Sequence, residues 1–130
     1  MPTKLGIREG SLVHLVHAPY GFADLLAPLP SGVEIRARAT NGLDVVAVFV
    51  TGQTDLRKRF TPLARKLDPA GRLWIAWPKK AAKVDTDLDF GTVQTIGLEA
   101  GLVDNKSASI TDVFQGLQFV YRLKDRPPRP

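Results

Sequence analysis

Two stretches decide which fold the sequence predicts: DVVAVFV at residues 44–50 and RLWIAW at residues 72–77. Both are almost continuously apolar, which is typical of strands covered on both faces in a parallel sheet. Between them, apolar residues recur at the spacings of one helix face: Leu56, Phe60, Leu63 and Leu67. The order strand, helix, strand predicts a parallel pair joined by a right-handed helical crossover.

The same alternation continues in both directions from this unit. The further expected strands cover residues 12–18, 33–39, 106–110 and 117–123, and the further expected helices cover residues 21–27 and 88–100. Asn41 and Gly42 are typical of a hairpin turn, but the apolar run that follows favours a central parallel strand. The whole order predicts a three-layer α/β fold: a mostly parallel sheet between helices, with a C-terminal antiparallel strand.

Local signals predict where the helices begin and end. The candidate N-caps are Thr51 or Thr54 for the helix that ends near residue 67, and Thr86 or Asp87 for the later helix. Pro62 leaves open a restart of the first of these helices, and we expect residues 68–71 to end it. In the short helix, Phe22, Leu25 and Leu26 are expected on one side.

Composition favours one soluble globular domain. The chain has 130 residues, of which 44% are hydrophobic and 24% charged, and it has no cysteine. We expect an α/β domain over residues 1–123 and a flexible tail rich in proline and arginine over residues 124–130. No apolar stretch approaches the roughly 20 residues of a membrane span, and no signal-peptide pattern is present. We therefore expect a cytoplasmic protein without a membrane partner, a disulfide or a thiolate metal site.

Charge is divided unevenly along the chain. Residues 57–83 contain nine basic side chains and one acidic one, whereas residues 85–112 contain six acidic side chains and one basic one. This polarity favours either an anionic ligand or head-to-tail pairing with a second copy. The alternative is that the basic run is a solvated helix face.

The central unit resembles a known enzyme fold. DVVAVFV, the helix after it and LDPAGRLWIAW at residues 67–77 are similar to the later half of class I S-adenosylmethionine-dependent methyltransferases. The resemblance implies a Rossmann-like sheet in which the first strand lies between the second and third and the final pair lies at the far edge. One early strand and helix of the complete fold are missing.

A second resemblance is to small uncharacterised bacterial proteins that share a domain of unknown function. The segments that carry it are KLGIREG at residues 4–10, APYGF at 18–22, LWIAWPKK at 73–80 and GLVDNK at 101–106. This resemblance implies no activity.

Methyl transfer has little support in the motifs. A nucleotide-type cofactor needs glycines after the first strand, but residues 18–22 hold one glycine, and Pro19 lacks an N–H donor. Residues 39–42, after the second strand, offer no carboxylate for ribose hydroxyls. We therefore expect no cofactor and place methyl transfer third, after ligand binding and after a protein-interaction role.

Ligands of open α/β sheets bind at the carboxyl ends of the parallel strands. The residues expected there are Tyr20 and Gly21 from the first strand, Thr51 from the third, and Trp77, Lys79 and Lys80 from the fourth. Rings beside ammonium groups, with a helix N-terminus near Thr51, predict non-catalytic binding of a small anionic ligand. In the alternative, Trp77 caps the core and both lysines are solvated.

Other chemistries find no support. His14 and His17 are expected on opposite faces of the first strand, so they cannot form a metal pair, and His17 is the one candidate acid or base. We expect no catalytic residue and no metal. The basic run lacks a helix-turn-helix or RNP pattern, so we also expect no specific nucleic-acid partner. A protein partner or a homo-oligomer remains the alternative to the small ligand.

Overall fold

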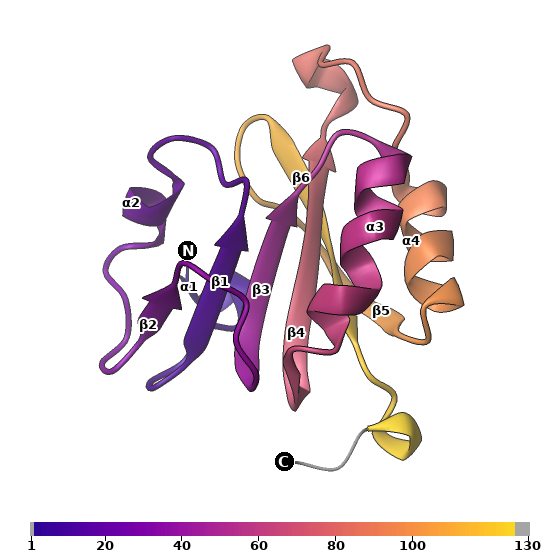
Figure 1. Cartoon of the computed structure of the whole chain (residues 1–130). Coiled ribbons are helices and arrows are strands. Elements are labelled where there is room, and N and C mark those ends of the chain that lie inside the picture. The colour runs from indigo at the N-terminus through magenta and orange to yellow at the C-terminus, as the bar shows by residue number, and fades with distance from the viewer. Residues whose placement is uncertain (1, 127–130) are drawn as a thin grey trace.

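The protein folds around one six-stranded sheet (Figure 1). The computed structural model describes residues 2–126. The strand order is β2-β1-β3-β4-β6-β5. The strands are β1 (Leu12–Val16), β2 (Glu34–Arg36), β3 (Leu43–Phe49), β4 (Leu67–Pro78), β5 (Val103–Ser109) and β6 (Phe114–Val120).

The pairing directions confirm the predicted mostly parallel sheet. Strand β1 pairs in parallel with both β2 and β3, so Asn41 and Gly42 do not form a hairpin turn. Strands β3 and β4 are also parallel, and β6 runs antiparallel to its neighbours β4 and β5. The expected position of β1 between β2 and β3, with the final pair at the far edge, is confirmed.

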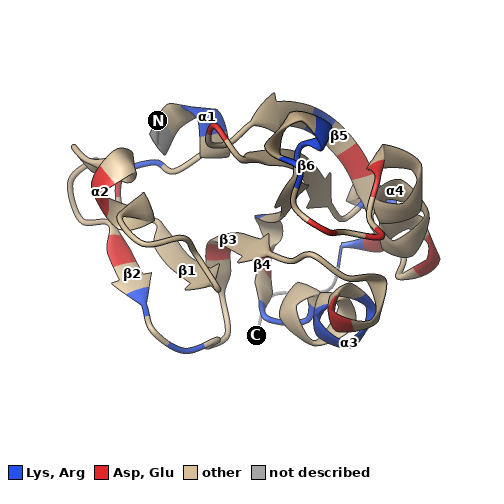
Figure 2. Cartoon of the chain, turned by 90° about the horizontal axis from the view of Figure 1, so that it is seen from above, with Lys and Arg blue, Asp and Glu red and all other residues tan. Residues whose placement is uncertain are grey.

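Helices lie on both faces of the sheet (Figure 2). They are α1 (Pro2–Leu5), α2 (Phe22–Leu26), α3 (Gln53–Ala64) and α4 (Phe90–Glu99), with short 3-10 turns η1 (Lys80–Ala82) and η2 (Leu123–Asp125). Helices α3 and α4 pack on one face, where Phe60 meets Phe119 edge to face with ring centroids 5.2 Å apart. Residues of α1 and α2 belong to the apolar cluster of the opposite face.

The first helix was not expected from the sequence, although it anchors the second apolar layer. Leu5 and Ile7 are buried beside β3 and β4. The Trp74 indole Nε1 donates a hydrogen bond to the Leu5 carbonyl at 3.0 Å. Because Trp74 is fully buried, this bond satisfies its only polar atom and fixes the N-terminal segment across the sheet.

Several local expectations are wrong. Residues 68–71 form no turn between elements; they lie inside β4, where the pairing with β3 shifts register. Of the two alternatives left open at Pro62, the structure shows the continuous helix: α3 runs through Pro62, which lies in its last turn. Leu25 points into solvent with 56% exposure, while Phe22 and Leu26 are buried as expected.

The structure covers only part of the expected tail. Lys124 and Asp125 belong to η2. The Asp125 N–H donates to the Arg122 carbonyl, and the Arg126 N–H donates to the Leu123 carbonyl. Residues 127–130 lie outside the described part. Flexibility of the tail stays a prediction.

Candidate functional site

A cavity of about 640 Å³ opens at the carboxyl end of β1. It lies between the loop that leads into α2 and the loop that joins β5 to β6. Its lining is mostly aromatic and aliphatic: Lys4, Pro19, Tyr20, Phe22, Leu25, Ile110, Thr111, Asp112, Val113 and Phe114. A volume of this size and a mostly apolar wall with few polar groups are typical of small-molecule sites.

Three phenylalanine rings support the wall of this cavity. Phe49, at the end of β3, contacts Phe22 with centroids 4.9 Å apart and Phe114 with centroids 5.1 Å apart, both edge to face. Phe22 is held there because Gly21, with φ of 80°, turns the chain into α2 and the Phe22 N–H donates to the Pro19 carbonyl. The aromatic wall is therefore set by packing before any ligand binds.

The opposite loop is fixed by Thr111. Its Oγ1 accepts hydrogen bonds from the N–H groups of Val113 at 3.1 Å and Phe114 at 3.0 Å. This turn directs Val113 outward and Phe114 toward Phe49. Asp112, at the tip of the loop, contributes the only carboxylate among the residues that line this cavity.

Lysine ammonium groups gather at the base of the same loop. Lys4 Nζ donates to the Ser109 carbonyl at 2.9 Å, and Lys79 Nζ donates to Ser109 Oγ at 2.6 Å. Lys106 Nζ donates to the Lys4 carbonyl at 2.9 Å and lies 6.0 Å from the ring centroid of Trp74. Among residues 2–126, none of these three lysines pairs with a carboxylate, so positive charge remains beside the apolar cavity.

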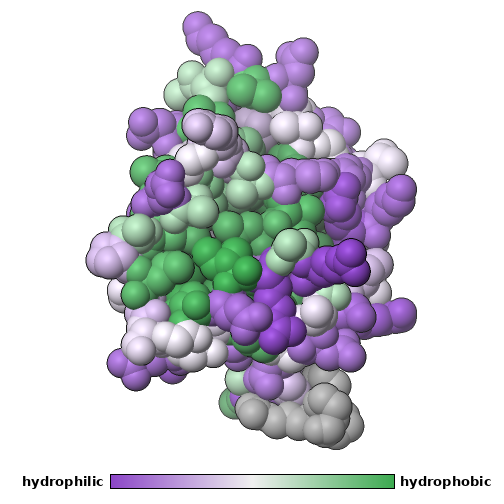
Figure 3. All heavy atoms as spheres, turned by 60° about the vertical axis from the view of Figure 1, so that its left-hand side comes forward, coloured by the Kyte–Doolittle hydropathy of each residue, from purple (hydrophilic) through white to green (hydrophobic). Residues whose placement is uncertain are grey.

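The rim of the cavity is exposed and apolar. Tyr20 is fully exposed, and Leu25 and Val113 are 56% and 39% exposed. Figure 3 turns the side of β2 and α2 toward the viewer and shows apolar side chains gathered in one area bordered by hydrophilic residues. Apolar surface concentrated on one side of a small protein indicates a contact surface for a ligand or a partner.

The six residues expected at the binding edge do not form one site. Tyr20 lines the 640 Å³ cavity, with Gly21 next to it at the start of α2. Trp77, Lys79 and Lys80 line a different cavity of about 540 Å³ between the end of β4 and the start of α4. Trp77 is buried in the core of the α3 and α4 face, which fits the alternative that it caps the core.

Thr51 lines neither cavity but lies beside the 540 Å³ one, because it is bonded to Thr86 of that lining, and the helix after it is already capped. Its carbonyl accepts a hydrogen bond from Thr86 Oγ1 at 2.6 Å. The expected caps from Thr51 or Thr54 are wrong, because Asp87 Oδ1 accepts from the Gln53 N–H at 2.8 Å and Gln53 Nε2 donates to the Asp87 carbonyl. The carboxylate of Asp87 therefore occupies the place at the start of α3 that an anionic ligand would take.

The cap of α4 also differs from the expectation. The N-cap residue is Asp89, not Thr86 or Asp87. Its Oδ1 accepts a hydrogen bond from the Thr92 N–H at 2.8 Å. These hydrogen bonds from Thr92 lower the pKa of Asp89 below its ordinary value of 3.8. Two of the three acidic side chains of this loop, Asp87 and Asp89, thus serve helix termini.

The two histidines line the same cleft, although they were expected on opposite faces of the first strand. His14 is buried, and its Nδ1 lies 2.9 Å from the Arg36 carbonyl. His17 has a φ of 57°, which ends the strand alternation after Val16, so both rings line one cleft between β1 and α3. Within residues 2–126, no group of three or more potential metal-ligating side chains is present.

Comparison with known proteins gives structural matches only, because no family model and no curated protein matches the sequence. A chain from Bordetella parapertussis described as a "possible exported protein" aligns with a TM-score of 0.64 at 13% identity, covering 91% of this chain and 64% of that one. A TehB-like SAM-dependent methyltransferase from Corynebacterium glutamicum aligns with a TM-score of 0.55 at 11% identity, covering 88% and 82%. Magnesium protoporphyrin IX methyltransferase from Synechocystis, solved with bound SAH, aligns with a TM-score of 0.56 at 11% identity, covering 90% and 76%.

The fold is that of SAM-dependent methyltransferases. The methyltransferase-like chain described here spans just under two thirds of the Bordetella protein's length. The second resemblance, to a domain of unknown function, has no support from a family model. No helix within residues 2–126 is long and apolar enough to cross a membrane.

The residues at the cofactor positions of this methyltransferase-like fold do not fit S-adenosylmethionine. The loop after β1 contains Pro19, and the Phe22 N–H is already bonded to the Pro19 carbonyl. At the end of β2, Arg36 is bonded to Glu34 and Thr40, and residues 39–42 after it contain no carboxylate. The carboxylate that would hold ribose hydroxyls is therefore missing after β2, and the loop after β1 has two backbone N–H donors fewer to offer a cofactor.

Proposed function

We propose that the protein binds a small amphipathic anion, without catalysis, in the cavity between the β1–α2 loop and the β5–β6 loop. The observation that supports this most directly is the aromatic wall formed by Phe22 and Phe114 next to the Lys4 ammonium. An aromatic or aliphatic body would bury its surface against the wall. A carboxylate on that body would pair with Lys4, with Lys79 adding positive charge from Ser109.

This proposal keeps part of the site expected from the sequence. Tyr20 remains at the rim and Lys79 remains close to the cavity through Ser109. The α3 N-terminus takes no part, because Asp87 caps it. Ligand binding at the carboxyl edge of the sheet follows the general rule for open α/β sheets.

A thermal-shift screen of aryl and alkyl carboxylates, followed by calorimetry, tests the proposal. A ligand at 100 times its Kd should stabilise the protein by about 2.7 kcal/mol, which for this chain length is a melting-temperature rise of roughly 10 °C. Lys4→Ala should weaken binding about tenfold, the size of one lost charge-assisted hydrogen bond. Lys79→Ala should act in the same direction.

Lys83→Ala is the matched control, because it removes one exposed lysine that lines none of the cavities described here. Equal weakening by Lys4→Ala and Lys83→Ala would indicate diffuse electrostatics and contradict the proposal. S-adenosylmethionine belongs in the same screen. Its tight, saturable binding would favour methyl transfer, which the loop after β1 gives little reason to expect.

The exposed rim favours one second candidate, a protein-interaction role. Tyr20, Leu25 and Val113 together would offer an apolar contact around a hollow that an apolar side chain of a partner could enter. A second copy of this chain is the simplest such partner. Sedimentation at increasing protein concentration, compared between wild type and Leu25→Asp, distinguishes this role, since only an interface through the rim would be weakened by the new charge.

A further inference from the structure

A second cleft, of about 620 Å³, lies on the α3 side of the sheet and away from the proposed binding cavity. Its walls are the middle of β1, the segment after β2 and the second and third turns of α3. The lining residues are His14, Leu15, Val16, His17, Ala37, Ala39, Lys58, Arg59, Pro62 and Leu63. Figure 2 shows blue segments on α3 and on the chain after β2.

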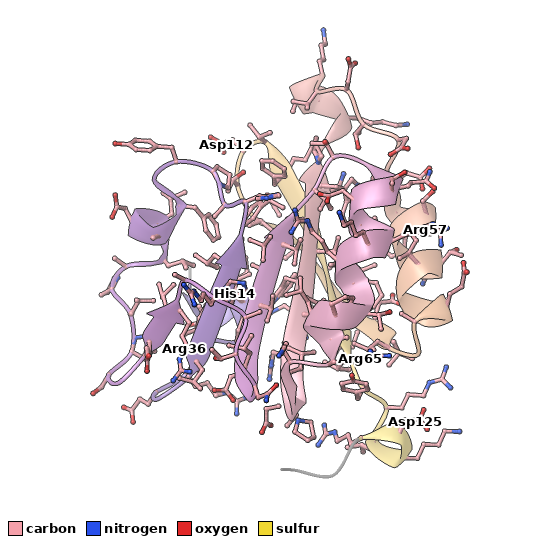
Figure 4. All side chains as sticks on the ribbon, viewed as in Figure 1. His14, Arg36, Arg57, Arg65, Asp112 and Asp125 are labelled. Carbon is pink, nitrogen blue, oxygen red and sulfur yellow. The ribbon has the colours of Figure 1, made fainter. Side chains whose placement is uncertain are left out.

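His14 is built into the floor of the cleft with one defined free nitrogen. The residue is 7% exposed, and its Nδ1 lies 2.9 Å from the Arg36 carbonyl on the adjacent strand (Figure 4). A carbonyl can only accept, so Nδ1 must carry the proton and Nε2 of the neutral ring is an acceptor. Nε2 has no hydrogen-bond partner within residues 2–126.

The same reasoning assigns the hydrogen-bonding roles of the two ring nitrogens of His17. A guanidinium can only donate, so the contact of 3.4 Å between Arg59 Nη2 and His17 Nε2 makes this nitrogen an acceptor. The other ring nitrogen, Nδ1, then carries a proton and is a donor. His14 Nε2 is therefore an acceptor and His17 Nδ1 a donor, each on a residue that lines the cleft.

Cations line the cleft and carboxylates do not. Lys58 forms no hydrogen bond or ion pair with another residue of the described chain. Arg59 binds Asp55 through Nε at 2.8 Å and keeps further N–H groups on its guanidinium. No aspartate or glutamate is among the lining residues, so the lining as a whole is positive.

The remaining surface of the cleft is apolar. Leu63 and Val16 are buried core residues, and Ala39 packs against the same core from the segment after β2. Pro62 adds a flat ring on the α3 side. Such a surface suits the apolar face of a small ring, while its polar groups suit substituents at the ring edge.

We propose that this cleft binds a small hydroxylated organic phosphate of the sugar-phosphate class. A phosphate monoester carries close to two negative charges at neutral pH and three acceptor oxygens. Lys58, Arg59 and the His17 N–H supply donors for these oxygens. The His14 Nε2 acceptor requires a donor on the ligand, which a sugar hydroxyl provides and a bare phosphate dianion does not.

The site is independent of the proposed amphipathic-anion cavity. The two share no lining residue, and α3 lines only the cleft. The cleft also lies below the carboxyl edge of the sheet, because His14 is in the middle of β1 and Pro62 is in the last turn of α3. Loss of binding in one place therefore leaves the other proposal untouched.

Titration of the labelled full-length protein with ribose 5-phosphate, observed through the imidazole NMR signals, tests the proposal. The ligand should shift the His14 and His17 signals saturably, and calorimetry should give the matching Kd. Lys58→Gln should weaken binding at least fivefold. Arg57→Gln is the matched control, because Arg57 is the residue before Lys58 in α3 but does not line the cleft. Its Nη1 lies 3.9 Å from Glu99 Oε2 (Figure 4).

Each outcome decides between specific binding and its alternatives. Unchanged affinity in Arg57→Gln and in Lys4→Ala supports the cleft as a separate site. Equal weakening by Lys58→Gln and Arg57→Gln overturns it, because both variants lower the net charge by one. Inorganic phosphate that binds as tightly as ribose 5-phosphate, or a ribose 5-phosphate titration without saturable shifts, also overturns the assignment.

Discussion

Replacing Gly97 by alanine should destabilise the protein, although sequence rules alone predict the opposite. Gly97 is in the interior of α4, where alanine is favoured over glycine by about 1 kcal/mol in intrinsic helix propensity. A Cβ at this position would lie 2.0 Å from Cε1 of Phe119 and 2.5 Å from two further atoms of the same ring. Two carbon atoms that are not bonded to each other cannot come so close, so the ring or the helix must move.

The ring has little freedom to move. Phe119 is completely buried and packs edge to face against Phe60, with centroids 5.2 Å apart and planes at 86°. Excess volume in a packed core costs about 1 to 3 kcal/mol. The 2.0 Å distance puts this position at the upper end of that range, so after subtraction of the propensity gain of about 1 kcal/mol the free energy of unfolding should fall by about 2 kcal/mol.

Urea unfolding of wild type, Gly97→Ala and Gly91→Ala measures this difference. Gly91 is in the first turn of the same helix, and a Cβ there would meet only Asp89 Oδ1, at 3.7 Å. Gly91→Ala should therefore raise the free energy of unfolding by up to about 1 kcal/mol, which would appear as a higher urea midpoint. A Gly97→Ala protein as stable as wild type would refute the close packing of α4 on β6.

Three further predictions concern acidic side chains. Asp87→Ala should lower the free energy of unfolding by about 1 kcal/mol, measured in urea, because it removes the cap of α3. Asp85→Ala makes the same change of charge, but Asp85 has no bonded partner in the described chain, so this control should have almost no effect. Equal losses would show that charge and not capping matters. The lowered pKa of Asp89 means that its stabilising contribution is present above the ordinary value of 3.8 and lost as pH falls through the lowered pKa, so thermal unfolding of wild type and Asp89→Asn should converge at low pH. A difference that stays constant with pH would contradict this cause. Asp112→Asn should tighten binding of an amphipathic anion severalfold in calorimetry, because it removes the one carboxylate of the cavity lining, and weaker binding would instead indicate a ligand that carries a cationic group.

The sheet could be predicted because its signals are local. Residues 44–50 and 72–77 are apolar on both faces, and this alone requires central strands covered by helices. The spacing of Leu56, Phe60 and Leu63 gives the buried face of α3 directly. The buried face of the short helix α2 was harder to predict, because a helix of only five residues is too short for periodicity to define its buried face. Leu25 fits the apolar spacing and still points into solvent.

The prediction failed for the α3 cap and for the start of β4, where a distant segment supplied the partner. Gln53 is bonded to Asp87, which is 34 positions away in the sequence, so no search among the neighbours of Thr51 could find the cap. Residues 68–71 look like a turn because Asp68, Pro69 and Gly71 are turn formers, yet the chain passes through them within β4. In both places, tertiary contacts outweighed a local preference.

The part of the proposed binding cavity that depends on the N-terminal segment was missed for the same reason, and the position of the cavity shows what the carboxyl-edge rule can predict. The rule places a site where β1 ends, and Tyr20 does line the cavity there. The rule does not say which face of the sheet the site uses. That choice depends on Lys4, whose ammonium reaches the Ser109 carbonyl across 105 positions of sequence, and on α1, which is held by the Trp74 bond to Leu5. Because the N-terminal segment and the β5–β6 loop meet only after the sheet has formed, the residues that give the cavity its charge share no pattern in the sequence.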